Sequence, residues 1–152
     1  MDDILKGIVF ADTNKTKSMA ALNGGWEGWL QIEVALAAIA SGKYTQVVRE
    51  GGYGDGKLRW DFVLTPNTNV KFGVELKAES AGQAYTIANA WWADVTKLGN
   101  QMQGFRVGYA YLITVSADAT AGANQLLNQS GGEIEMIKQQ DAVSLYRYIL
   151  RL

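Results

Sequence analysis

The chain has 152 residues, of which 48% are hydrophobic, and a formal net charge of −1 with a pI of about 5.4. It contains neither cysteine nor histidine, which excludes Cys/His zinc sites, Ser-His-Asp and Cys-His nucleophiles, and every nuclease mechanism that needs an imidazole. The near-neutral net charge is not the strongly basic charge typical of proteins that bind nucleic acid extensively and non-specifically.

Length and hydrophobic content predict one domain over residues 1–152 with a substantial core. Within it we expect an N-terminal arm or helix at 1–23, a core at about 24–115, and a C-terminal helix with strands at 116–152. No signal peptide or long apolar run is visible, so we expect a cytoplasmic protein without membrane contact.

Residues 26–41 predict the strongest helix, and the segment after Glu33 is apolar all round, which indicates burial on most sides. Glu33 adjoins this buried half and needs a partner for its charge, so we rank it ahead of Glu27 as an acid that faces a functional cleft. Glu27 is the alternative candidate. It lies in the first turn of the helix, where the helix dipole stabilises an exposed acid that has no functional role. Gln31 lies one turn beyond Glu27 on the same side.

Weaker signals flank this helix. Apolar residues within 4–10 predict a short helix that packs on the domain, and the polar stretch 13–17 predicts a loop or mobile arm. Residues 44–50 predict the first strand. The glycine-rich linker 51–56 predicts a hairpin tip that could move over a substrate.

Residues 57–80 predict an antiparallel hairpin. Apolar side chains occupy the even positions of 58–64 and again of 70–76, a period-two pattern typical of strands. The connection at 65–69 has the composition and length of a hairpin loop. The two strands can share one buried face only if even residues lie opposite even residues.

This register brings Asp61, Glu75 and Lys77 to one common face. A turn centred on residue 67 or 68 places Asp61 opposite Gly73 or Glu75, at about 5 Å for a direct pair and 7–8 Å for a diagonal one. Gly73 would leave room at the site. Two carboxylates at this separation repel unless a cation or a proton lies between them, and oxygen ligands favour Mg²⁺ or Mn²⁺.

Helix and strand then alternate to the C-terminus. A capping box from Ser80 to Gln83 opens a predicted helix whose apolar stripe continues to Met102, with Lys97 on its polar side. The later elements are a strand covered on both faces at 105–115, a helix at 118–129, and short strands at 133–138 and 143–150, the last of which could instead be helical.

The Asp61 carboxylate and the Glu75-Leu76-Lys77 run, set in the order helix, three strands, helix, strand, resemble the PD-(D/E)xK nuclease superfamily. The resemblance covers about residues 24–115, and Trp60 stands where the family name has proline. It implies an α/β fold with a restriction-endonuclease-like αβββαβ core, a central mixed sheet flanked by helices.

The resemblance also implies how the site works. Asp61, Glu75 and the Leu76 carbonyl would hold Mg²⁺ or Mn²⁺, Lys77 would orient or activate the attacking water, and the first-helix acid Glu33 would assist. The implied function is metal-dependent hydrolysis of nucleic-acid phosphodiester bonds. We expect DNA ahead of RNA as the nucleic-acid partner, although the sequence does not decide between them, and a homodimer is one arrangement. Further side chains placed to contact substrate are Arg59, Glu27, Gln31 and Lys97.

Two other functions are weighed against this one. A Glu and a Lys two apart on a strand form, by themselves, only a solvated ion pair, so a catalytically inactive nuclease-like fold that binds nucleic acid or protein is the alternative. A glycosidase-type carboxylate pair is disfavoured, because Lys77 beside Glu75 favours the ionised form where that chemistry needs a protonated acid.

Overall fold

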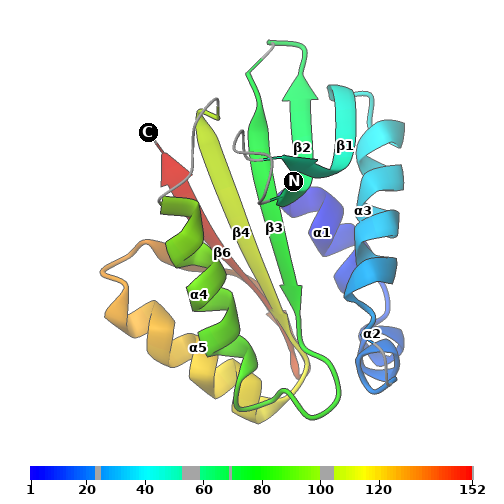
Figure 1. Ribbon diagram of the computed structural model, residues 1–152. Helices are drawn as coiled ribbons and strands as arrows, with labels where there is room; N and C mark the ends of the chain where they lie inside the picture. The colour runs from blue at the N-terminus through cyan, green and yellow to red at the C-terminus, as the bar shows by residue number, and fades with distance from the viewer. Residues whose placement is uncertain (23–24, 53–58, 69, 100–104, 152) are drawn as a thin grey trace.

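The computed structural model describes residues 1–22, 25–52, 59–68, 70–99 and 105–151. Its six strands form one mixed sheet in the order β1-β2-β3-β4-β6-β5, in which only β3 and β4 are parallel (Figure 1). In chain order the elements are α1 (Asp2–Val9), α2 (Thr13–Ala20), α3 (Glu27–Ala40), β1 (Tyr44–Gly52), β2 (Arg59–Pro66), β3 (Phe72–Ala78), α4 (Ile87–Gly99), β4 (Val107–Thr114), α5 (Ala117–Gln129), β5 (Ile134–Gln140) and β6 (Val143–Arg151). The predicted α/β fold with a mixed sheet flanked by helices is confirmed.

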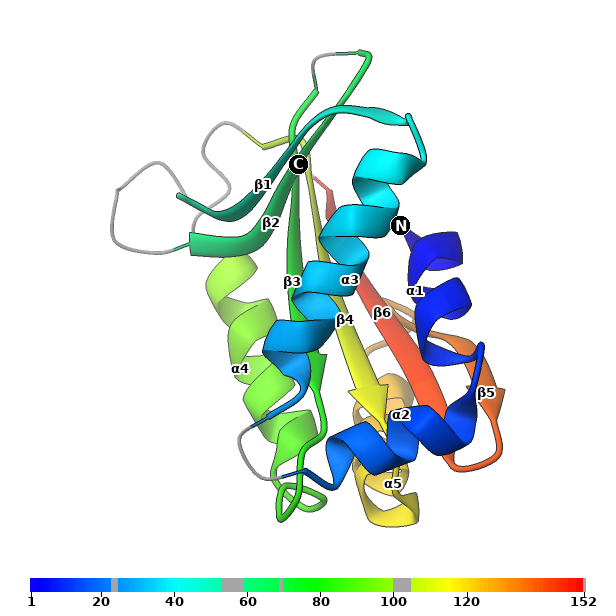
Figure 2. The same cartoon turned by 90° about the vertical axis from the view of Figure 1, so that its right-hand side faces the viewer.

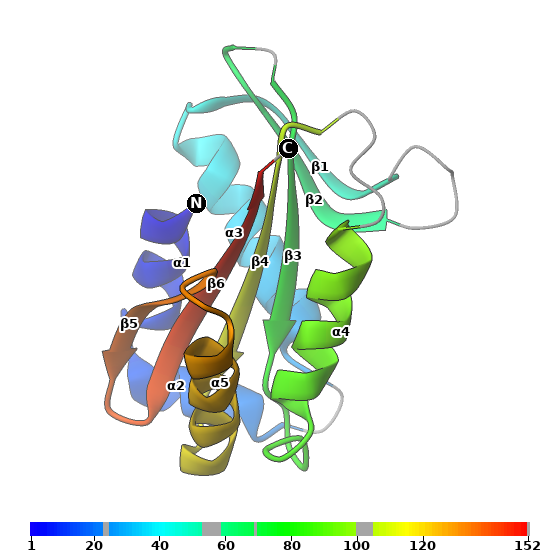
Figure 3. The ribbon, with the colours of Figure 1, turned by 90° about the vertical axis from the view of Figure 1, so that its left-hand side faces the viewer.

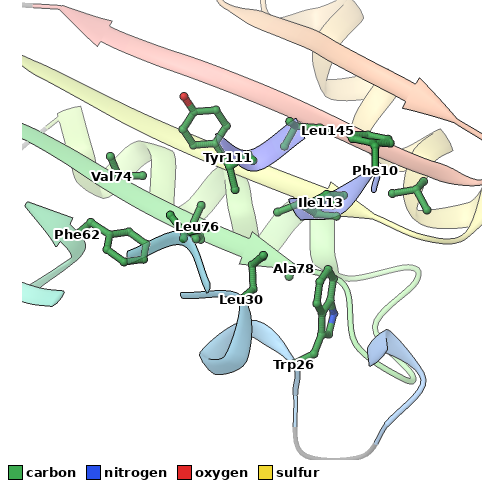
Figure 4. Packing of buried hydrophobic residues seen from close by; sticks show 14 of the residues in the cluster. Phe10, Trp26, Leu30, Phe62, Val74, Leu76, Ala78, Tyr111, Ile113 and Leu145 are labelled. Carbon is green, nitrogen blue, oxygen red and sulfur yellow. The ribbon is translucent and has the colours of Figure 1, made fainter. Parts of the chain in front are cut away.

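Helices cover both faces of the sheet. Helices α1, α2 and α3 lie on one face (Figure 2), and α4 and α5 lie on the other (Figure 3). Each face has its own apolar core: Leu30 of α3 and Leu76 of β3 belong to the first (Figure 4), whereas Trp91 of α4 and Ala123 of α5 belong to the second. This two-sided covering places β3 and β4 in the interior of the molecule.

Strand β4 has the two-sided burial that its composition predicts. Tyr111 and Ile113 pack in the core under α1 and α3, while Ala110 and Leu112 pack in the core under α4 and α5. All four side chains are fully buried. A strand with one apolar set on each face reads as continuously hydrophobic, as this one does.

The β2–β3 pairing follows one of the two predicted registers. Phe62, Val63 and Leu64 pair with Val74, Gly73 and Phe72, which centres the turn on residue 68. Continuing this register by one step sets Asp61 opposite Glu75. The paired ladder stops before that step, and the beginning of β2 lies apart from the C-terminal half of β3 (Figure 2).

Trp60 departs from the predicted shared face. Phe62 and Leu64 pack in the core under α3, but Trp60 packs in the opposite core, with its ring centroid 5.3 Å from that of Phe105. A Cβ placed on Gly73 would fall 2.2 Å from the Trp60 ring. The expectation that Gly73 leaves room for a metal is therefore wrong, because the space over this glycine holds the indole.

Two local predictions are corrected by side-chain hydrogen bonds. The stretch 13–17 is part of helix α2 and not a loop, since the Asp12 carboxylate caps it by accepting from the Lys15 N–H at 3.0 Å. Ser80 and Gln83 form a turn, in which the Ser80 N–H donates to Gln83 Oε1 at 3.1 Å, and helix α4 begins only at Ile87.

The last segment, at 143–150, forms strand β6 and not the alternative helix. Strand β6 pairs with both β4 and β5. The predicted hairpin tip at 51–56 lies largely outside the described residues, as does the end of the apolar stripe at Met102.

The contact between Gly73 and Trp60 makes a stability prediction. We expect Gly73→Ala to lower the free energy of unfolding by about 1–3 kcal/mol, because the added methyl overlaps a fully buried indole. Denaturant titration measures this loss. The matched control is Gly7→Ala in α1, where a Cβ meets nothing within 4 Å, and it is expected to leave stability unchanged or slightly higher. Equal behaviour of the two variants would contradict the packing.

Candidate active site

A pocket of about 180 Å³ opens where β2 separates from β3. It lies between the start of α3 and the middle of α4, in the gap between β2 and the C-terminal half of β3. The residues that line it are Glu27, Arg59, Asp61, Glu75, Leu76, Lys77, Asp94 and Lys97. The three residues of the predicted motif, Asp61, Glu75 and Lys77, thus lie in one place.

Two carboxylates take over backbone positions that β2 leaves unpaired. The Leu76 N–H donates to Asp61 Oδ2 at 2.7 Å, and the Ala78 N–H donates to Glu27 Oε2 at 3.0 Å. A buried strand edge without such partners would be costly, so these bonds stabilise the separation of the strands. Because the N–H and C=O of one strand residue point the same way, the Leu76 carbonyl also faces this gap.

A chain of polar side chains orients Asp61. Gln31 Nε2 donates to Asp61 Oδ1 at 2.8 Å, and Arg49 Nη2 donates to Gln31 Oε1 at 3.0 Å. With its amide held by Arg49, Gln31 presents its NH₂ group to the carboxylate. Both Asp61 oxygens are therefore fixed, one by α3 and one by β3, which makes Gln31 a support for the site.

The carboxyl groups of Asp61 and Glu75 interact directly. Burial raises the Asp61 pKa above its ordinary value of 3.8, against the Leu76 N–H and a hydrogen bond from Glu75, which lower it. A hydrogen bond between two carboxyl groups requires a proton on one of them. A cation bound between the two groups would take the place of that proton.

Lys77 is held by the carboxylate of Asp94. Its ammonium lies 3.0 Å from Asp94 Oδ2, and Asp94 Oδ1 also binds Lys97 at 2.8 Å. Burial by itself would lower the Lys77 pKa, but the Asp94 hydrogen bond and the charges of Glu27, Asp94 and Asp61 raise it above 10.5. Lys77 is therefore a fixed cation at neutral pH. The alternative in which it deprotonates water needs a lowered pKa and is not supported.

The helix acid at this pocket is Glu27, not Glu33. Glu33 is six residues further along α3, about 240° around the helix axis, and is not among the residues that line the pocket. Gln31 is only about 40° from Glu27 and does reach the site. Burial raises the Glu27 pKa above 4.5, against the Ala78 N–H and the Lys77 charge, which lower it. The expectation that Glu33 is the helix acid facing the cleft is therefore wrong. Burial of a helix does not determine which of its acids points at the gap between β2 and β3.

The residues present fit a hydrated divalent cation. Among the described residues no three His, Cys, Asp or Glu side chains lie close enough together to hold a metal. Mg²⁺ keeps several waters and often takes only one or two carboxylates from the protein, which matches Asp61 and Glu75 with the Leu76 carbonyl beside them. The pocket also carries an excess of acids: four, Glu27, Asp61, Glu75 and Asp94, against three bases, Arg59, Lys77 and Lys97.

Arg59 and Asp94 complete the rim. Arg59 is exposed and lies 3.6 Å from Glu50, so its charge faces both solvent and the pocket. Sequence reasoning missed Asp94, although its position three residues before Lys97 on the polar side of α4 was a usable signal. It also missed Arg49, whose role depends on a contact with Gln31 across α3 and β1.

Comparison with protein-family models, with curated proteins and with solved structures found no match for this chain. Within the described part of the chain, no helix is long and apolar enough to cross a membrane.

The acid pair makes a prediction about pH and stability. Because the Asp61 pKa is raised on folding, the folded protein loses stability as the pH rises from 3.8 through the raised value. We expect Glu75→Gln to raise the free energy of unfolding at pH 7 by about 0.5–1.5 kcal/mol, because the Gln amide donates to the Asp61 carboxylate without a bound proton. Below pH 3.8 the gain should vanish, since a carboxyl proton then supplies the same donor.

Thermal or denaturant unfolding at several pH values, without divalent cations, measures this effect. Glu33→Gln is the matched control and is expected to show no such pH-dependent gain. A Glu75→Gln variant that is less stable than wild type at pH 7 would contradict the hydrogen-bonded carboxyl pair.

Proposed function

We propose that this protein is a metal-dependent nuclease with a restriction-endonuclease-like core, which hydrolyses nucleic-acid phosphodiester bonds by a PD-(D/E)xK-type mechanism. The observation that carries the proposal is the meeting of Asp61, Glu75 and Lys77 in one pocket beside the Leu76 carbonyl. The order of elements from α3 to β4, helix, three strands, helix and strand, agrees with the αβββαβ core of that superfamily.

Asp61, Glu75 and the Leu76 carbonyl would hold Mg²⁺ or Mn²⁺ in this proposal. The bound ion would supply charge neutralisation at the phosphate and a lower pKa for a water ligand. Asp61 is suited to this role because Gln31 and the Leu76 N–H fix its oxygens before any ligand arrives. Glu75 provides the second carboxylate from the adjacent strand.

Lys77 and Glu27 would act on the water and the phosphate. The permanently charged Lys77 donates hydrogen bonds to a phosphate oxygen or to the attacking water, and Asp94 holds it in position. Glu27, whose pKa is raised by burial, is the group of this chain best suited to accept the proton from that water. Arg59 and Lys97 at the rim would contact the flanking backbone phosphates, and DNA is the expected substrate.

A cleavage assay tests the proposal. Supercoiled plasmid and linear single-stranded DNA and RNA are incubated with wild type at several Mg²⁺ and Mn²⁺ concentrations, with EDTA as the metal-free arm. We expect metal-dependent cleavage that falls about 10²-fold or more in Glu75→Gln and in Lys77→Met, because each removes a group that acts on the reacting phosphate or water.

The matched control is Glu33→Gln, which changes an acid of the same helix outside the pocket and should cleave like wild type. Cleavage that survives EDTA, or that is unchanged in both site variants, would refute the mechanism. A folded wild-type protein that binds nucleic acid but cleaves none of the substrates would identify the catalytically inactive binding fold instead.

A further inference from the structure

A second pocket, of about 330 Å³, adjoins the candidate active site. It is formed by the start of α3, the end of β3, the turn after β3 and the first turn of α4. Its lining residues are Gly25, Glu27, Gly28, Lys77, Ala78, Ser80, Gln83, Thr86, Ile87 and Ala90. Glu27 and Lys77 belong to both pockets, so the second pocket begins at the groups proposed to act on the scissile phosphate.

The two pockets differ in charge. The active-site pocket carries the cations Arg59, Lys77 and Lys97, which suit phosphate groups. Among the described residues that line the second pocket, only the shared Glu27 and Lys77 are charged. The pocket offers instead the hydroxyls of Ser80 and Thr86, the amide of Gln83 and the exposed methyl group of Ala90. This mixture suits a sugar and a base better than a second phosphate.

The size of the second pocket limits what can enter. Its volume is near the lower end of the range of about 300–1,000 Å³ for small-molecule sites. This is room for one nucleoside between α3 and α4. A base that is paired and stacked within a duplex cannot reach such a pocket unless it leaves the stack, which costs energy that an unpaired base does not spend.

We infer that the second pocket holds the nucleoside next to the scissile phosphate, so that the substrate is a single-stranded or unpaired stretch of polynucleotide. The inference rests on the proposed nuclease function. The neutral pocket receives the sugar and base, while the adjacent site positions the phosphate at Asp61, Glu75 and Lys77. Fully paired duplex is a poor ligand, because its bases cannot enter.

Gly28 allows this pocket to be filled without touching the active-site pocket. It lies in helix α3, lines only the second pocket, and a Cβ built on it meets nothing within 4 Å. Gly28→Leu would therefore project into the pocket while the helix gains a better helix-forming residue. Gly7→Leu in α1 is the matched control, since Gly7 is also helical and exposed with open space around its Cβ.

The experiment measures binding of fluorescein-labelled single-stranded DNA and RNA 12-mers by anisotropy. Both leucine variants are made on the Glu75→Gln background, so that substrate is not consumed. We expect Gly28→Leu to weaken binding of the preferred single strand about tenfold and Gly7→Leu to leave it unchanged. A duplex of the same sequence with hairpin-capped ends should bind more weakly than the single strand.

Gly28→Leu binding like Gly7→Leu, or capped duplex binding as tightly as single strand, would overturn the inference. These results are separable from the fate of the proposed function. If wild type cleaves but position 28 has no effect on binding, the nuclease stands and the nucleoside pocket fails. If wild type cleaves nothing with either metal while Gly28→Leu still weakens single-strand binding, the pocket stands and the catalytic function fails.

Discussion

The separation of β2 from β3 is the constraint on which the candidate site depends. The two strands pair over only three residues each, and beyond that point the edge of β3 turns its N–H groups toward side chains instead of a neighbouring strand. Asp61 and Glu27 satisfy two of these groups, at Leu76 and Ala78. A β-sheet that paired further would bury the same acids against backbone and leave no pocket.

The separation has a structural cost that the surrounding packing offsets. Trp60 turns to the α4 side and lies over Gly73, so the strand that carries Asp61 is anchored in a different core from Phe62 two residues later. Buried carboxylates with raised pKa values add a further cost. Groups with shifted pKa values that meet in a pocket are candidates for a functional site, and structural ion-pair networks shift pKa values as well.

Some polar residues of the site hold the side chains of the predicted motif in position. Arg49 and Gln31 hold Asp61, and Asp94 holds Lys77, so that neither group of the motif depends on ligand for its position. The acids that line the pocket outnumber its basic residues, and a bound divalent cation would neutralise this excess. In the proposed function the charged pocket would take the phosphate, and the adjoining pocket, whose described lining adds no charge beyond Glu27 and Lys77, would take the nucleoside.

The sequence by itself determined the α/β class, the order of strands and helices after residue 25, and the two registers that bring Asp61 toward Glu75, because strand periodicity and turn length are local properties. It could not determine that Glu27 reaches the pocket in place of Glu33, or that Asp94 holds Lys77. Those facts depend on how α3 and α4 are rotated against the sheet, and this rotation is set by packing between residues far apart in the chain. The turn of Trp60 away from Phe62 was likewise decided by tertiary contacts, because the indole packs against Phe105 in the opposite core. The helix at 13–20, by contrast, has a local cap at Asp12.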